Sequence, residues 1–363
     1  MRKRNITSMV TAAVLTASLL AGCGSTEQTT AETGAATEAE TEVETEAETE
    51  AVSGEQEDGD APIAQAEESG EGTEASAEEA DEENYETGDA ALDDTRNADG
   101  IGEKELLVIS FGTSYNDSRR LTIGAIEGAM EEAFPDWSVR RGFTSQIIID
   151  HVKSRDDVAI DNVGEALDRA VDNGVKQLVV QPTHLMDGLE YNDVVDEVAQ
   201  YADAFEQIAI GKPLLTSDED FQTVVEIITA ETADYDDGNT AICFMGHGTE
   251  AESNQVYAKM QTLLTEAGYA HYYVGTVEAE PSLDDVLAQV QEGGYTRVVL
   301  MPLMIVAGDH ANNDMAGEEE GSWKTVFEAA GYEVVPVVQG LGELEGIQEL
   351  LVQHAQEAVD SLN

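Results

Sequence analysis

Two histidines and one glutamate stand at similar places in the second half of the chain, each shortly after an apolar run. His247 lies in a Met-Gly-His-Gly-Thr segment, Glu278 ends a Gly-Thr-Val-Glu segment, and His310 follows Gly-Asp. Two imidazoles and one carboxylate make a three-ligand set with open coordination positions, which is typical of catalytic metal sites. Such ligands suit divalent Co, Ni, Fe or Zn, and affinity order alone does not choose among these ions. We therefore interpret His247, Glu278 and His310 as metal ligands.

Each of these side chains also has an ordinary explanation. A single histidine near a strand end is more often a hydrogen-bonded loop residue, and Glu278 alone would be a solvated carboxylate in so acidic a chain. The set is more specific than its members, because all three residues follow predicted strands in the same way.

The metal-site prediction depends on parallel strands that bring these segments together. From Ile101 onward, short β-branched runs alternate with amphipathic stretches, which predicts a parallel sheet covered by helices. The expected strands are 106–111, 138–142, 177–181, 208–212, 241–245, 271–275, 297–301 and 333–338. The expected helices are 119–134, 163–173, 191–205, 252–267, 283–291 and a last one with apolar residues at helical spacing from Leu344 to Ala358. Ligands of such sheets bind beyond the carboxyl ends of the strands, where His247, Glu278 and His310 fall.

The two halves of this region resemble each other. Ser-Phe-Gly-Thr-Ser at 110–114 corresponds to Phe-Met-Gly-His-Gly at 244–248, and two further segment pairs follow at similar offsets. The first-half counterparts of the three ligands are Thr113, Gln146 and Glu190, which make a poor metal set. The expected fold is α/β, with two similar lobes at 101–235 and 236–363, each a parallel sheet flanked by helices, and a cleft between them.

These segments carry a family resemblance. Met245-Gly-His-Gly-Thr249, the Val-Gly-Thr-Val-Glu run ending at Glu278, and the Leu-Met-Pro-Leu-Met…Gly-Asp-His run ending at His310 resemble the sirohydrochlorin cobaltochelatases of anaerobic cobalamin biosynthesis. The resemblance implies a class II chelatase, a lyase that uses no nucleotide, with the tetrapyrrole sirohydrochlorin bound between two chelatase-like lobes. It implies Co²⁺ as the inserted ion, with Fe²⁺ or Ni²⁺ as alternatives, and His247, Glu278 and His310 as its ligands.

Roles follow from the chemistry of insertion. The ion must lose water and the tetrapyrrole must lose two pyrrole protons, and a neutral imidazole binds metal and accepts a proton once the ion leaves. We therefore expect His247 and His310 to be catalytic as well as metal-binding, with Glu278 completing the site. The pattern does not say which histidine is the base.

Three further residues are weaker substrate-binding candidates. His184, in Gln-Pro-Thr-His, lies on the first-lobe loop, and exported relatives suggest a haem or substrate contact there; a hydrogen-bonded loop histidine is the ordinary alternative. Arg119 and Arg120 are among the few bases of an acidic domain that must accept a polycarboxylate, so we expect them to meet substrate carboxylates.

The charge of the chain excludes nucleic acid as a partner. Asp and Glu number 76 against 17 Lys and Arg, a net charge of -59, whereas phosphate binding needs clustered bases. Residues 24–100 hold a single base, Arg96, and few large apolar groups, which predicts an acidic disordered linker.

The first 23 residues read as an export signal. A basic start and an apolar run lead into Leu20-Ala-Gly-Cys23, which resembles a bacterial lipobox, so 1–23 is expected to be a lipoprotein signal peptide with Cys23 lipidated. A signal-anchor helix is the alternative. The protein is then expected outside the cytoplasm, anchored to the membrane through Cys23, and a homo-oligomer is compatible with the sequence. The other cysteine, Cys243, lies in an apolar strand and is expected in the core.

Two other functions stay open at this point. A membrane-tethered protein that binds metal or tetrapyrrole, haem included, without turnover is favoured by the export signal. An acidic surface scaffold with a relic site fits the acidic linker, but not the retained ligands.

Overall fold

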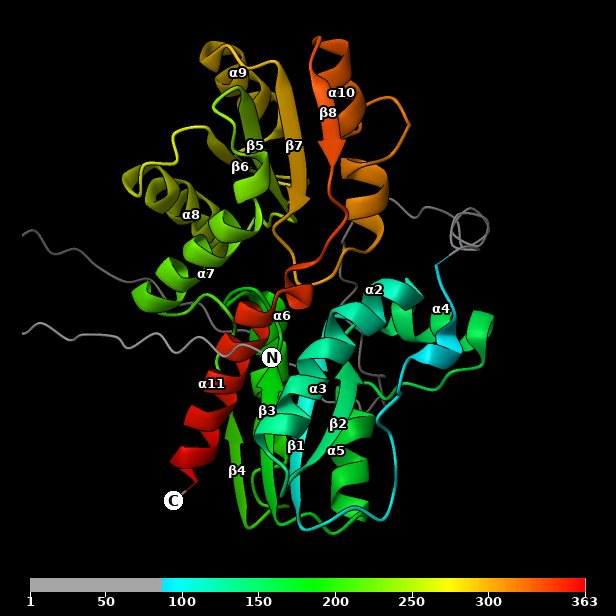
Figure 1. Cartoon of the computed structure of the whole chain (residues 1–363). Coiled ribbons are helices and arrows are strands. Elements are labelled where there is room, and N and C mark those ends of the chain that lie inside the picture. Colours follow the sequence, from blue (N-terminus) through cyan, green and yellow to red (C-terminus); the bar gives the residue numbers. More distant parts are fainter. Residues whose placement is uncertain (1–86, 363) are drawn as a thin grey trace, which may run out of the picture. The chain divides into compact units, whose positions relative to one another are not determined.

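A computed structural model describes residues 87–362; the predicted signal peptide, Cys23 and most of the predicted linker lie outside the described residues. Two four-stranded parallel sheets form the framework, ordered β2-β1-β3-β4 and β6-β5-β7-β8 (Figure 1). The strands are β1 (Lys104–Ser110), β2 (Ser138–Phe143), β3 (Gln177–Pro182), β4 (Gln207–Ile210), β5 (Thr240–Gly246), β6 (Tyr272–Thr276), β7 (Arg297–Pro302) and β8 (Glu333–Pro336). All eight predicted strands are present, and the shared strand order confirms the two similar lobes.

Helices connect the strands of each sheet. They are α2 (Asn116–Leu121), α3 (Ile123–Ala133), α4 (Gln146–Asp156), α5 (Val163–Asp172), α6 (Leu189–Gln200), α7 (Asp218–Glu231), α8 (Gln255–Glu266), α9 (Leu283–Gly293), α10 (Trp323–Ala329) and α11 (Glu345–Ser361). Short turns of helix complete the list: η1 (Ala90–Leu92), η2 (Ala233–Tyr235), η3 (Glu252–Asn254), the π-helical η4 (Ala311–Met315) and η5 (Leu341–Glu343). Helices α4, α7 and α10 were not predicted.

The single helix expected at 119–134 is two helices. The chain bends at Thr122, whose φ and ψ of -105° and -77° end α2, while its hydroxyl donates to the carbonyl of Ser118. A threonine hydroxyl bonded to the carbonyl four residues earlier often bends a helix. The bend therefore separates α2 from α3 at Thr122.

The two lobes exchange their outer helices, so the predicted boundary near residue 235 does not separate them. Helix α11, which the sequence assigned to the second lobe, packs on α3, β3 and β4 of the first sheet (Figure 1). Helix α7, assigned to the first lobe, packs on α8 and α11. Buried residues of both helices, such as Val224 and Leu351, belong to one hydrophobic cluster that also holds Ile242 of β5. This shared core ties the lobes together.

The described structure begins before the point where the sequence places the end of the linker. Residues 87–100, here called the strap, include η1 and run along β2, the edge strand of the first sheet. The backbone amide of Arg141 donates to the carbonyl of Arg96, and the guanidinium of Arg140 donates to the carbonyl of Ala98 at 2.8 Å. The predicted linker boundary at Gly100 is therefore too late, because composition does not reveal these contacts.

Two smaller points concern Cys243 and the membrane. Cys243 is fully buried in β5, as expected, and burial raises the pKa of its thiol. Among the helices of residues 87–362, none combines the length and the apolar character needed to cross a bilayer.

Candidate metal centre

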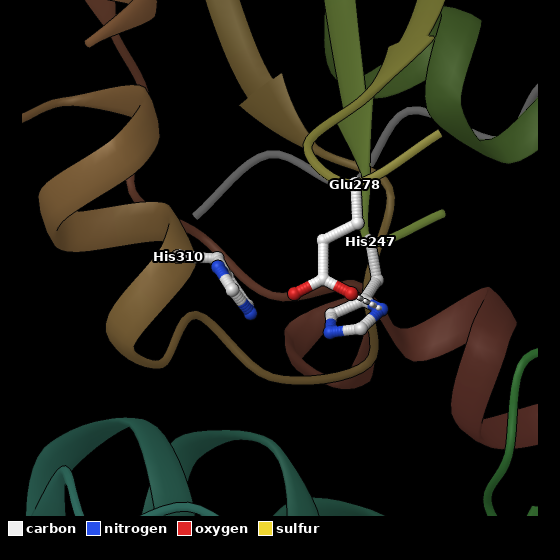
Figure 2. A group of neighbouring side chains, drawn as sticks. All are labelled: His247, Glu278 and His310. Carbon is white, nitrogen blue, oxygen red and sulfur yellow. Dashed lines mark ion pairs between the residues drawn. The ribbon is translucent and has the colours of Figure 1, made fainter. Parts of the chain in front are cut away.

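The three predicted ligands converge at the carboxyl ends of β5, β6 and β7. His247 directly follows β5, Glu278 lies two residues after β6, and His310 precedes η4 in the segment that follows β7. One ligand atom of each lies within 4.8 Å of the other two, and Figure 2 shows the Glu278 carboxylate between the two imidazoles. The imidazole centroids are 4.7 Å apart and nearly perpendicular. Within the described chain this is the one group of His, Cys, Asp and Glu side chains that could hold a metal ion.

The loops that carry His247 and Glu278 are bonded to each other. The carbonyl of His247 accepts hydrogen bonds from the amides of Val277 and Glu278. Gly248 permits this approach: its φ is +92°, and a Cβ there would be 2.8 Å from the Ala279 nitrogen. Nδ1 of His247 lies 2.8 Å from the carbonyl of Gly248 and 3.8 Å from Oε2 of Glu278. A proton on Nδ1 donated to that carbonyl leaves Nε2 as the metal-binding nitrogen.

His310 is oriented by a carboxylate one helical turn away. Nδ1 of His310 lies 2.7 Å from Oδ2 of Asp314. This hydrogen bond raises the pKa of His310 above its ordinary value, against burial, with further contributions from the charges of Asp309 and Glu278. A carboxylate on one ring nitrogen fixes the tautomer and makes the other nitrogen a stronger ligand. Asp314 was not singled out from the sequence, although its spacing of four from His310 was the available signal.

The first lobe approaches the metal centre at two points. The amide of Ala307 donates to the hydroxyl oxygen of Ser118 at 3.0 Å, and a Cβ on Gly308 would be 3.1 Å from Oγ1 of Thr113. Elsewhere, a Cβ on Gly188 would be 3.4 Å from Oγ of Ser253. The strand-end loops of the two sheets therefore meet beside the ligands.

The first-half counterparts of the ligands do not form a second metal site among the described residues. Thr113 is buried against Gly308, and Gln146 bonds Asp150 and Asn162. Glu190 differs from Thr113 and Gln146 because its side chain interacts with a ligand of the metal centre. Partial burial raises the pKa of Glu190, and the charge of His247 acts to lower it.

His184 is buried and makes no hydrogen bond with the described chain. Neither ring nitrogen has a hydrogen-bond partner there, and Nε2 lies 3.9 Å from Oε2 of Glu190. Burial lowers the pKa of His184 to about 4, so the ring is neutral near pH 7. The described chain therefore offers no partner for a hydrogen-bonded loop histidine, and a substrate or haem contact stays a prediction.

Arg119 is not available to substrate carboxylates, contrary to the prediction. Its side chain is fully buried and donates to Asp93, to the carbonyl of Thr113 and to Asn116. The error arose because the partner Asp93 lies in the segment that composition assigned to the linker. Arg120 keeps 36% of its side chain exposed beside Asp117, so its role as a substrate contact stays a prediction.

Comparisons with known proteins agree with this geometry. The sequence profile of the family described as cobalt chelatase (CbiK) matches residues 104–360. The sirohydrochlorin cobaltochelatase of Salmonella typhimurium is 36% identical over 258 residues, 71% of this chain and 97% of the relative. The sirohydrochlorin cobaltochelatase CbiKC of Nitratidesulfovibrio vulgaris is 32% identical over 263 residues, 72% of this chain and 92% of the relative.

Solved structures share the two-lobed α/β fold. SirB from Bacillus subtilis with Fe³⁺ aligns with a TM-score of 0.52 at 14% identity, covering 72% of this chain and 97% of that one. The sirohydrochlorin chelatase SirB from Bacillus subtilis subspecies spizizenii, in complex with cobalt, aligns with a TM-score of 0.50 at the same identity and coverage. At this identity the likeness concerns the fold alone.

Proposed function

The chain belongs to the cobalt chelatase family, and on that premise we propose that it inserts Co²⁺ into sirohydrochlorin without a nucleotide. The observation that carries the proposal is the convergence of His247, Glu278 and His310 within 4.8 Å at the ends of three neighbouring strands. The curated relatives, 32% and 36% identical, are both sirohydrochlorin cobaltochelatases. Fe²⁺ and Ni²⁺ suit the same ligands and are the alternative ions.

The metal ion is a substrate, so the site must hold it and then release it. Nε2 of His247, Nε2 of His310 and a Glu278 oxygen supply three ligands and leave positions for pyrrole nitrogens to replace water. The carboxylates of Glu278, Asp309 and Asp314 surround His310 with negative charge, which favours a cation. Exposed fractions of 31% to 56% for the ligand side chains leave the site open to a large second substrate.

Insertion releases two protons as two pyrrole N–H bonds break and the ion binds the nitrogens. His310 is suited to take one proton at Nε2 when the ion leaves, because Asp314 stabilises its charged form. His247 or Glu278 takes the other. The ligands that held the ion thus become proton acceptors.

Exposed apolar side chains after the strands of the first sheet suit the flat face of a tetrapyrrole. Phe111, Ile147 and Leu189 follow β1, β2 and β3, the adjacent strands of the first sheet, and are 44%, 82% and 68% exposed. Large exposed apolar groups at one edge of a sheet mark a binding surface. Arg120 is the base we propose for a substrate carboxylate, and His184 is the residue we propose for a haem or substrate contact.

We also propose that lipid on Cys23 and the acidic segment after it tether this domain to a membrane outside the cytoplasm. The basis is the sequence of the first 23 residues. The export signal alone would suit capture without turnover, but the family relationship supports insertion.

The test is a rate measurement with site variants. The purified chain is mixed with sirohydrochlorin and Co²⁺, and the absorption of the cobalt product is followed. His310→Ala should lower the insertion rate by about a hundredfold or more. The matched control is His271→Ala, because His271 pairs with Asp236 outside the site. A wild-type rate in His310→Ala would refute the assignment.

A further inference from the structure

The strap, residues 87–100, precedes the family-matched region of 104–360 and nevertheless contributes a buried carboxylate to the first lobe. Asp93 has 3% of its side chain exposed. One of its oxygens lies 2.7 Å from Nε of Arg119 and 2.7 Å from NH1 of Arg141, and the side chains of both arginines are fully buried. A buried arginine that loses its carboxylate partner strongly destabilises the folded state, so both arginines require Asp93.

The strap supplies two members of a larger buried charge cluster. Arg141 also pairs with the buried Glu127 at 2.6 Å. Arg96 of the strap reaches Glu127 at 2.9 Å and Glu131 at 3.2 Å. Three carboxylates thus face three guanidiniums, with one group of each sign supplied by the strap. Arg119 and Arg141 hold the pKa of Asp93 below its ordinary value, although burial alone would raise it.

The beginning of the strap also holds α2 by its backbone. The carbonyl of Thr87 accepts a hydrogen bond from the amide of Asp117 at 2.7 Å, and the carbonyl of Gly88 accepts one from the side chain of Asn116 at 3.2 Å. The first turn of α2 is therefore bonded to the strap at two adjacent residues.

From Asp93 a direct chain of contacts leads to the metal centre. Arg119, paired with Asp93, donates through NH1 to the carbonyl of Thr113 at 3.2 Å and through NH2 to Asn116. Thr113 lies against Gly308, and the hydroxyl oxygen of Ser118 in α2 accepts a hydrogen bond from the amide of Ala307. Ala307 and Gly308 lie just before His310. The loop between β1 and α2, residues 111–115, and α2 together form what we call the first-lobe wall.

We propose that the strap is a working part of the catalytic domain: through Asp93 and Arg119 it positions the first-lobe wall beside the metal centre. Asp93 and Arg119 are positioning residues and touch no substrate. The metal ligands follow β5, β6 and β7, which belong to the other sheet, so loss of Asp93 should disturb the tetrapyrrole side and spare the metal side. The inference rests on the proposed function for its kinetic consequence, and on contacts alone for its structural one.

The experiment compares Asp93→Asn and Arg119→Lys in the full chain. Asp93→Asn removes the shared charge, whereas Arg119→Lys keeps the charge but loses the forked contacts to Thr113 and Asn116. The control is Asp94→Asn, which removes a neighbouring exposed carboxylate and retains the oxygen that accepts from the Arg96 amide. Three quantities are measured: hydrogen exchange of the amides in 113–119, affinity for Co²⁺ alone, and kcat/KM for sirohydrochlorin.

Both variants should speed exchange in 113–119 and lower kcat/KM by on the order of tenfold to a hundredfold, as expected for a misplaced wall. Their affinity for Co²⁺ alone should stay within about twofold of the wild-type value. Loss of a residue that bonds directly to a metal ligand would lower this affinity by about 10- to 100-fold. The control should match the wild type in all three quantities.

Two results would overturn the proposal. One is unchanged exchange and unchanged kcat/KM in both variants. The other is a parallel loss of Co²⁺ affinity, kcat/KM and melting temperature, which would make the strap a source of general stability only. If Asp93→Asn does not fold, Arg119→Lys decides, because it keeps the charge balance. If the wild-type chain shows no insertion, the proposed function fails, and the exchange data still decide the role of the strap.

Discussion

The hydrogen bond between His310 and Asp314 makes a prediction with two opposite consequences. Asp314→Asn leaves an oxygen near Nδ1 but removes the charge that stabilises the imidazole as a ligand. Loss of such an outer partner weakens metal binding by about 10- to 100-fold, or roughly 1.4 to 2.7 kcal/mol. We expect the Kd for Co²⁺, measured without tetrapyrrole above about pH 8, to rise by this factor.

The same substitution should also lower the acid limit of binding, which is the pH below which affinity for Co²⁺ is lost. In the wild type, the Asp314 hydrogen bond raises the pKa of His310 above 6.5, so protons compete with metal at a pH where a free imidazole is already neutral. Protonated imidazole does not bind metal, and affinity is lost as the pH falls through this raised pKa. Without the charge of Asp314 the pKa falls toward 6.5, and the acid limit moves to lower pH.

Calorimetric titration with Co²⁺ across a pH series measures both effects. Asp284→Asn, an exposed carboxylate at the start of α9, is the matched control and should bind as the wild type does. The reasoning is refuted if Asp314→Asn keeps wild-type affinity at high pH, or if its acid limit stays where the wild type has it.

Three further outcomes follow from other contacts. Glu105 is buried without a hydrogen-bond partner, and burial raises its pKa from 4.5 to about 7. Because ionisation of Glu105 then opposes folding, Glu105→Gln should raise the free energy of unfolding by up to about 3 kcal/mol above about pH 7 and leave it unchanged below about pH 4.5. Urea unfolding at the two pH values measures this difference. Leu351→Ala in α11 should cost about 2–5 kcal/mol in the same assay, because the residue is fully buried in the core shared by both lobes, while exposed Glu349→Ala should cost little. Gly248→Ala should weaken Co²⁺ binding by about tenfold or more, because its Cβ would meet the backbone of the Glu278 loop; an unchanged Kd would show that this loop can shift freely.

Much of the fold follows from local pattern. The strands were predictable because a buried parallel strand needs a continuous apolar run, and Val179 or Val299 lies in the middle of one. The metal ligands were predictable because parallel strands of one sheet end at the same edge, so residues placed alike after them meet there.

Other features depend on contacts that no local pattern encodes. An amphipathic stretch shows that one face of α11 is buried, but not that it lies on the sheet of the other lobe. Arg119 looked like a free base because its partner, Asp93, stands 26 residues earlier in an acidic segment. A buried ion pair is invisible in composition, and here it moved both a domain boundary and a proposed substrate contact.

The central claim is that this chain turns over, and the most direct measurement counts product per chain. The wild-type protein is incubated with a large excess of sirohydrochlorin and Co²⁺, and cobalt-sirohydrochlorin is quantified after separation from protein, against a protein-free reaction. The account predicts many equivalents of free product per chain, formed by way of His247, Glu278 and His310. Product that stops at about one equivalent and stays bound to the protein would contradict it, because a capture protein binds its ligand once.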